Sequence, residues 1–184
     1  MKSRGLSESR HARAPSRDKR GTKSQKPPAV RAKKVVYDDQ TTCDSCGSVY
    51  TRKTWRQPST RGATTTARTG AVVPRCPACE QMRDGRSYGS VLLRGSYVLA
   101  HEEEIRRRAR HVAARAGYTQ PQRRIVAFRR TRTGFEVTTT SQKLAHRLVH
   151  ELKKAFHGRA SYSWSDRDGR LMARWERVSD ADTT

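Results

Sequence analysis

Four cysteines in two closely spaced pairs are the residues of this sequence whose types and spacing indicate chemistry. The pairs are Cys43–Cys46 and Cys76–Cys79, and each has two residues between its cysteines. A Cys-x-x-Cys turn directs two thiolates toward one ion, and two such turns give the closed four-thiolate shell of structural zinc sites. The spacing therefore predicts a zinc ribbon with one structural Zn2+ and no open position for a catalytic water.

Disulfide bonds and a redox-active pair are alternative roles for these cysteines. Disulfides are disfavoured in a cytosolic protein. A redox pair at Cys76–Cys79 would need a strand-to-helix junction, and residues 80–85 show no helical pattern. A zinc cluster that also responds to oxidation stays open as an alternative.

The charge of the chain indicates the class of partner. The 184 residues include 40 Lys and Arg against 17 Asp and Glu, which gives a net charge of +23. Such a chain repels itself unless a polyanion neutralises it, and nucleic acid is the commonest cytosolic polyanion. No apolar run approaches the roughly 18–20 residues of a membrane span. The N-terminus has basic residues but no following apolar stretch, so it is not expected to be a secretory signal. The sequence predicts a cytoplasmic protein without membrane contact.

The N-terminal segment, residues 1–35, holds 12 Lys and Arg, two acids and almost no large apolar side chain. Such a composition cannot offset the chain entropy of folding, so a disordered basic arm that orders against phosphates is predicted. A solubilising or targeting tail is the simpler alternative. The candidate phosphate contacts are Arg13, Arg17, Lys19, Arg20, Lys33 and Lys34.

The segment between the cysteine pairs is basic as well, because residues 51–75 contain no acid. Trp55 stands among these cations and either stacks on an exposed base or packs as the small core of the ribbon. Both interpretations are kept. The candidate RNA-binding residues here are Arg52, Lys53, Trp55, Arg56, Arg61 and Arg68.

The C-terminal half reads as a small α+β domain. Strands are expected at 88–100 (with Gly95 as a bend or bulge), 122–131, 134–140, 159–165 and 170–178. Helices are expected over 101–118 and from Ser141, which is a good N-cap, to the glycine at 158. This order, βα-ββα-ββ, predicts a split-βαβ, ferredoxin-like sheet with helices on one face. The predicted organisation is a basic arm (1–35), a zinc ribbon (36–87), an α/β domain (88–178) and a short tail (179–184).

The first of these helices has an arginine-rich surface. Three glutamates stand at its expected N-terminus, where negative charge is favoured, and its apolar stripe leaves most arginines on other faces. Those proposed to contact RNA are Arg106, Arg107 and Arg110.

Patterns that would indicate an enzyme are missing from the sequence. There is no Gly-rich phosphate loop, nucleophile elbow or paired-carboxylate pattern. His146 and His150 are spaced i, i+4, but no third ligand is evident. A non-enzymatic protein is expected.

Several short segments resemble the zinc-ribbon family of the large-subunit nuclear export adaptor that is linked to nonsense-mediated decay, in the form of its short prokaryotic relatives. The matching segments are residues 42–48, Cys-Pro-Ala-Cys at 76–79, the turn from Arg132 to Val137, and residues 161–166. The resemblance covers about residues 40–178 and implies binding to the large ribosomal subunit through ribosomal RNA. The only functional residues that the resemblance assigns in this sequence are the four cysteines, as metal ligands. The chain has a single set of four cysteines, so export is not part of the expectation.

The sequence thus predicts a zinc-stabilised RNA-binding protein that associates with the ribosome, in subunit maturation or in ribosome idling (hibernation). A DNA-binding regulator and a redox-responsive zinc switch are the alternatives. No helix-turn-helix or heptad zipper is visible, which weighs against the first. The oligomeric state is not predicted.

Overall fold

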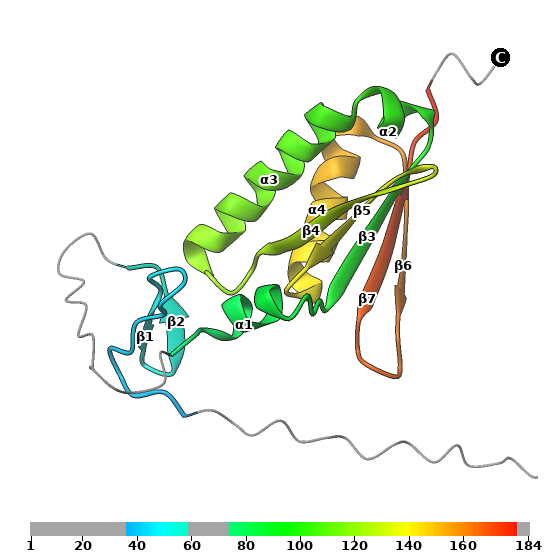
Figure 1. Ribbon diagram of the computed structural model, residues 1–184. Coiled ribbons are helices and arrows are strands. Elements are labelled where there is room, and N and C mark those ends of the chain that lie inside the picture. Colours follow the sequence, from blue (N-terminus) through cyan, green and yellow to red (C-terminus); the bar gives the residue numbers. More distant parts are fainter. Residues whose placement is uncertain (1–35, 59–73, 180–184) are drawn as a thin grey trace, which may run out of the picture. The chain divides into compact units, whose positions relative to one another are not determined.

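The computed structural model describes residues 36–58 and 74–179, which belong to one compact unit that begins at Val36 (Figure 1). The chain is of the mixed α+β class. The predicted basic arm and the tail from residue 180 lie outside the described residues. So do eight of the candidate RNA contacts: Arg13, Arg17, Lys19, Arg20, Lys33, Lys34, Arg61 and Arg68.

The cysteine-bearing part contains a β-hairpin and a short helix. Strands β1 (Val49–Thr51) and β2 (Thr54–Arg56) pair antiparallel around a two-residue turn. Helix α1 (Pro77–Arg83) begins directly after Cys76, the first cysteine of the second pair. Pro77 occupies the first helical position, where the backbone N–H that proline lacks would have no partner within the helix. The expectation of no helix after Cys79 is therefore wrong. A seven-residue helix is too short to show a clear apolar period.

Five strands form the main sheet, in the order β4-β5-β3-β7-β6. The β3–β7 pair is parallel, and the other three pairs are antiparallel. The strands are β3 (Gly89–Arg94), β4 (Ile125–Thr131), β5 (Gly134–Thr139), β6 (Arg159–Trp164) and β7 (Leu171–Glu176).

The observed sheet order differs in one respect from a four-stranded ferredoxin-like sheet. Strand β5 lies between β3 and β4, as in a split βαβ unit. On the other side of β3, however, strand β7 occupies the position that the strand following the second helix would take, and β6 is displaced to the edge. The added hairpin strand creates the parallel β3–β7 pair.

Two long helices, α3 (Glu102–Thr119) and α4 (Gln142–Phe156), lie on one face of this sheet (Figure 1). Alternate residues of β3, Val91 and Leu93, are buried beneath them, as expected for a sheet covered on one side. The predicted cap of α4 is confirmed, because the Ser141 hydroxyl accepts a hydrogen bond from the Leu144 N–H at 3.3 Å. Within the described residues, no helix is long and apolar enough to span a bilayer.

A strand predicted to run from 88 to 100 instead ends at Arg94, and a short helix, α2 (Ser96–Ala100), follows it. The cause is Gly95, which has a φ of 113°. A Cβ atom at this position would overlap the carbonyl oxygen of Arg177. The predicted bend within a strand at Gly95 is therefore wrong, because the conformation of this glycine ends the strand and begins a helix.

Candidate metal centre and nucleic-acid interface

The sulfur atoms of Cys43, Cys46, Cys76 and Cys79 form one cluster, in which all four lie within 4.8 Å of one another. Cys46 Sγ and Cys76 Sγ are 3.7 Å apart. Four sulfurs bound tetrahedrally at about 2.3 Å from a zinc ion would be about 3.8 Å apart. The cluster therefore fits a tetrahedral metal ion, and the four ligands predicted from the sequence are brought together.

The first pair is shaped by a tight turn. The Cys43 N–H donates to Ser48 O at 2.8 Å, and the Gly47 N–H donates to Cys43 O at 2.9 Å. Gly47 has a φ of 68°, a left-handed conformation that glycine adopts without the steric cost of a side chain. This turn brings Cys43 and Cys46 to the same ion.

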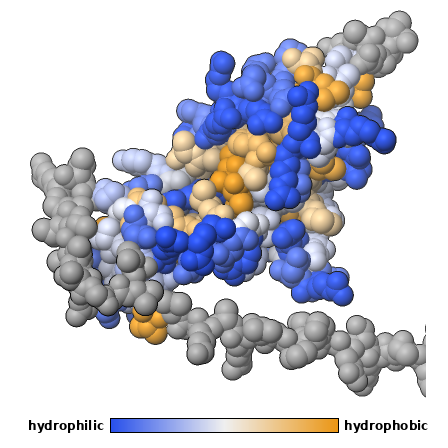
Figure 2. Space-filling view, in the orientation of Figure 1, coloured by the Kyte–Doolittle hydropathy of each residue, from blue (hydrophilic) through white to orange (hydrophobic). Residues whose placement is uncertain are grey.

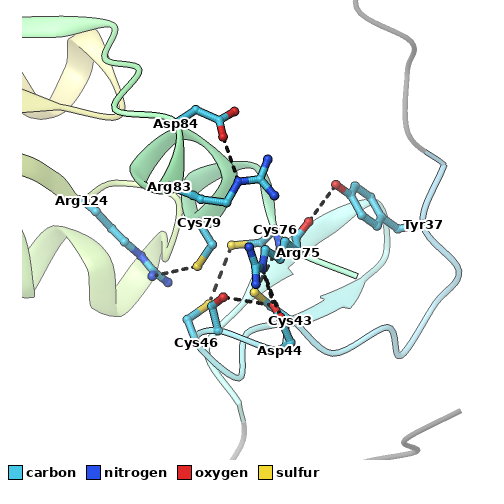
Figure 3. Close-up of polar contacts among 11 residues, drawn as sticks. Tyr37, Cys43, Asp44, Cys46, Arg75, Cys76, Cys79, Arg83, Asp84 and Arg124 are labelled. Carbon is cyan, nitrogen blue, oxygen red and sulfur yellow. Dashed lines mark hydrogen bonds and ion pairs between the residues drawn. The ribbon is translucent and has the colours of Figure 1, made fainter. Parts of the chain in front are cut away.

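The second pair approaches from helix α1, with Cys76 as its N-cap and Cys79 within it. The backbone N–H of Cys76 donates to Cys43 Sγ at 3.3 Å, so each pair contacts the other. The Arg75 guanidinium also binds the Asp44 carboxylate, at 3.3 and 3.1 Å, and Tyr37 Oη donates to Arg75 O (Figure 3). These contacts join two segments that are more than 30 residues apart in the sequence.

An arginine of the connection between α3 and β4 approaches the cluster. Arg124 Nη1 donates to Cys79 Sγ at 3.4 Å (Figure 3). Arg124 Nε donates to Pro121 O at 2.7 Å. A divalent ion held by four thiolates has a net charge of −2, which a nearby guanidinium partly offsets. Burial lowers the pKa of Arg124, but the thiols, Cys46 first among them, outweigh it and raise the pKa.

The thiols differ in acidity. Burial raises the pKa of Cys76, and burial together with the neighbouring thiols raises that of Cys79. Burial acts in the same direction on Cys46, but hydrogen bonds from Ser48 and Arg124 outweigh it and lower its pKa to about 6. Cys46 is thus the first of these three to become a thiolate.

Trp55 is packed in the small core around the metal centre. Its side chain is only 6% exposed, and its ring lies 5.0 Å from that of Tyr37 and 5.4 Å from that of Tyr50. A base has no free ring face on which to stack here. Of the two interpretations of Trp55, packing is confirmed and stacking is wrong.

The hairpin turn next to Trp55 carries two exposed cations in an uncommon conformation. Arg52 and Lys53 have φ values of 50° and 61°, the pattern of a type I′ turn, in which Asn-Gly is the usual pair. Arg56 is exposed at the end of β2. Three of the predicted RNA-binding residues therefore project from one hairpin.

Besides the Arg124–Cys79 contact, two hydrogen bonds join the cysteine-bearing part to the last turn of α3 and to the connection between α3 and β4. Gln57 Nε2 donates to Gly117 O at 3.2 Å, and the Ala78 N–H donates to Gln122 Oε1 at 3.1 Å. Residues of both parts line a cavity of about 540 Å3, which we call the basic cleft. None of its lining residues is acidic: they are Lys53, Thr54, Trp55, Arg56, Pro77, Thr119, Gln120 and Gln122.

The predicted arginines of α3 have different surroundings. Arg106 binds Glu102 at 2.8 Å and lies over the Phe128 and Phe135 rings, so it is committed to the fold. Arg107 is exposed and forms no ion pair with any residue of the described ranges. Arg110 is exposed above the Phe128 ring at 5.5 Å. Two of the three thus face solvent.

Sequence reasoning missed Arg124 and Gln122 of the α3–β4 connection. A usable signal exists, because residues 105–135 include ten arginines and no acid. The segment from 45 to 79 is likewise free of acids. The basic cleft forms where these two acid-free segments meet.

No protein-family model matches this sequence, and no curated protein shows significant similarity to it.

Proposed function

We propose that this protein is a non-enzymatic, zinc-stabilised RNA-binding protein that associates with the ribosome through ribosomal RNA, with the large subunit favoured. The observation that carries the proposal is the basic cleft, in which two acid-free segments meet and cations face solvent. Phosphate groups are the partner that such a surface fits, because they supply most of the affinity in nucleic-acid binding.

The role of the metal in this proposal is structural. Four cysteines fill the coordination shell of a tetrahedral ion, and thiolates suit zinc. The ion would hold the β1–β2 hairpin against α1 and thereby fix Lys53 and Arg56 at the cleft. Arg124 would offset part of the negative charge of the centre.

The surface outside the cleft supports an extended RNA contact. Figure 2 shows hydrophilic residues over much of the face in view, around smaller hydrophobic areas. Arg107 and Arg110 add exposed positive charge on α3. The 12 basic residues of segment 1–35 would add further phosphate contacts. The ribosome as the RNA partner is supported by the resemblance of the cysteine segments and of the turn at 132–137.

Binding of labelled ribosomal RNA fragments at increasing salt tests the RNA-binding part of this proposal. If about 6–10 cations contact phosphates, affinity falls roughly 10³- to 10⁵-fold between 50 and 200 mM salt. The Lys53→Glu/Arg56→Glu variant should lose much more affinity than Lys153→Glu/Lys154→Glu, which makes the same charge change on α4. Equal losses would mean that only net charge matters, and preference for duplex DNA would favour the DNA-binding alternative.

Sedimentation of the tagged protein on sucrose gradients, with and without RNase, tests the ribosomal part. Co-migration with the large subunit or with whole ribosomes is expected. Precursor subunits in growing cells would indicate maturation, and whole ribosomes in starved cells would indicate idling. A protein that stays at the top of the gradient in both states contradicts ribosome association.

Redox-responsive metal release is a second candidate, favoured by Cys46. This thiol is partly exposed and has a pKa of about 6, so it is a thiolate at neutral pH. The thiolate would attack hydrogen peroxide and take one oxygen to become a sulfenic acid, and the other oxygen would leave as hydroxide. A neighbouring thiol would then attack the sulfenic sulfur, form a disulfide and release water. Metal release on peroxide addition, reversed by a dithiol reductant, tests this function.

A further inference from the structure

We infer that the basic cleft and the adjacent Tyr118 form a binding site for an unpaired RNA nucleotide, in which Tyr118 stacks on the base. This inference rests on the proposed function and names the part of the RNA that the cleft binds. Tyr118 directly precedes Thr119, a lining residue of the cleft, and directly follows Gly117, whose carbonyl oxygen accepts the hydrogen bond from Gln57.

Exposure and charge single out Tyr118 among the aromatic side chains. Tyr118 is 80% exposed, whereas Trp164 is 59% and Tyr88 is 44% exposed. Trp164 is followed by a turn that includes Asp166 and Asp168, whose carboxylates would repel phosphate. Tyr118 lies within the acid-free segment 105–135. An exposed ring among cations is the arrangement that stacks on unpaired bases.

The amide groups of the cleft offer donors for a base edge. Gln122 Oε1 already accepts from the Ala78 N–H, but Gln122 Nε2 is buried and has no acceptor among the described residues. The buried Trp55 Nε1 of the same lining likewise lacks a described acceptor. Buried donors without acceptors are costly, so an oxygen or ring nitrogen of a base that reached Gln122 would offset this cost.

The cations of the hairpin complete the site. Lys53 and Arg56 line the cleft, and neither forms an ion pair with a residue in the described ranges. They are placed to hold the phosphates that flank a stacked base. Bases in a duplex are stacked on one another, so single strands, loops and bulges are the RNA that this site selects.

Fluorescence anisotropy with a labelled single-stranded RNA of mixed sequence, and with a fully paired RNA duplex, tests the inference. Tyr118→Ala is expected to weaken single-strand binding roughly 5- to 150-fold, the range for loss of one stacking aromatic, and to leave the salt slope unchanged. Tyr118→Phe keeps the ring and should bind like the wild type. Trp164→Ala removes a different exposed aromatic ring and serves as the matched control.

The outcomes separate this inference from the proposed function. Wild-type binding that Tyr118→Ala leaves unchanged would overturn the nucleotide site and leave RNA binding intact. Equal weakening of single-strand and duplex binding would overturn it too, because stacking requires an unpaired base. Failure of the wild-type protein to bind any RNA would overturn both. Because Tyr118 is 80% exposed, its replacement should not disturb the core, which circular dichroism and zinc content verify.

Discussion

The cysteine-bearing part (residues 36–86) and the sheet part (residues 87–179) hold their backbones in place by different means. Among the described residues, the sheet part buries 18 core residues in one hydrophobic cluster, whereas the cysteine-bearing part buries five, of which three are cysteines. So small an apolar cluster cannot offset the entropy of ordering the chain around it. One part is thus stabilised by hydrophobic packing, whereas the other has a small core around four cysteines that are positioned to bind a metal.

Removal of the metal should produce the largest effect and should be confined to one part. Structural zinc contributes about 10–16 kcal/mol in small zinc-binding domains. Excess chelator, or Cys76→Ser, is therefore expected to abolish hydrogen-exchange protection in the cysteine-bearing part and to preserve it in β3, β5 and β7. Protection lost equally throughout residues 36–179 would show that the two parts do not differ in this way.

A cavity in the apolar core should have the opposite effect: it should destabilise the sheet part and leave zinc binding by the cysteine-bearing part unchanged. Leu148 of α4 is 1% exposed, and Leu148→Ala is expected to destabilise the sheet part by about 2–5 kcal/mol. Thermal unfolding measures this loss, with Lys153→Ala on the exposed face of the same helix as control. Zinc affinity should stay at the wild-type value, and a parallel fall in zinc affinity would contradict the distinction.

A lower pH should weaken zinc binding by the cysteine-bearing part. The raised pKa values of Cys76 and Cys79 mean that both are protonated at neutral pH, so a metal ion must displace two protons to bind them. Zinc affinity should therefore fall as pH falls, by about tenfold per pH unit for each displaced proton. Below about pH 6 the dependence should steepen as Cys46 also becomes protonated. Chelator competition over this range measures it, and a pH-independent affinity would contradict it.

The Arg124 contact tests whether the two parts are coupled. Arg124→Gln is expected to lower zinc affinity by roughly 10- to 100-fold, the usual effect of losing a group that contacts a metal ligand. Arg123→Gln removes a neighbouring positive charge without removing that contact and should have a smaller effect. If Arg124→Gln binds zinc no more weakly than Arg123→Gln, the Arg124 contact does not contribute to the metal centre.

The sequence predicted the cluster of four cysteines well because two closely spaced pairs are a local pattern that needs no knowledge of the fold. It also located the strands after residue 120, the two long helices and the Ser141 cap, all of which follow from periodicity and capping. Local patterns could not show that Gly95 begins a helix, because the overlap at that position involves Arg177, far along the chain.

The residues around the ligands were less predictable, because their roles depend on distant contacts. Trp55 could stack or pack, and only the positions of Tyr37 and Tyr50 decided between these. Arg124 follows Cys79 by 45 residues, and nothing in the sequence pairs the two. The position of β7 between β3 and β6 likewise depends on which strands meet, and the order of elements alone does not specify this.

The left-handed turn at Arg52 and Lys53 implies a trade-off between stability and function. Non-glycine residues in this conformation cost of the order of 1 kcal/mol each, and Asn-Gly would fill the same turn with less strain. A screen for thermostable variants should therefore recover Asn-Gly here, at the expense of two cations beside the basic cleft. Arg52 and Lys53 thus keep two positive charges at a turn whose backbone conformation alone would favour the uncharged pair Asn-Gly.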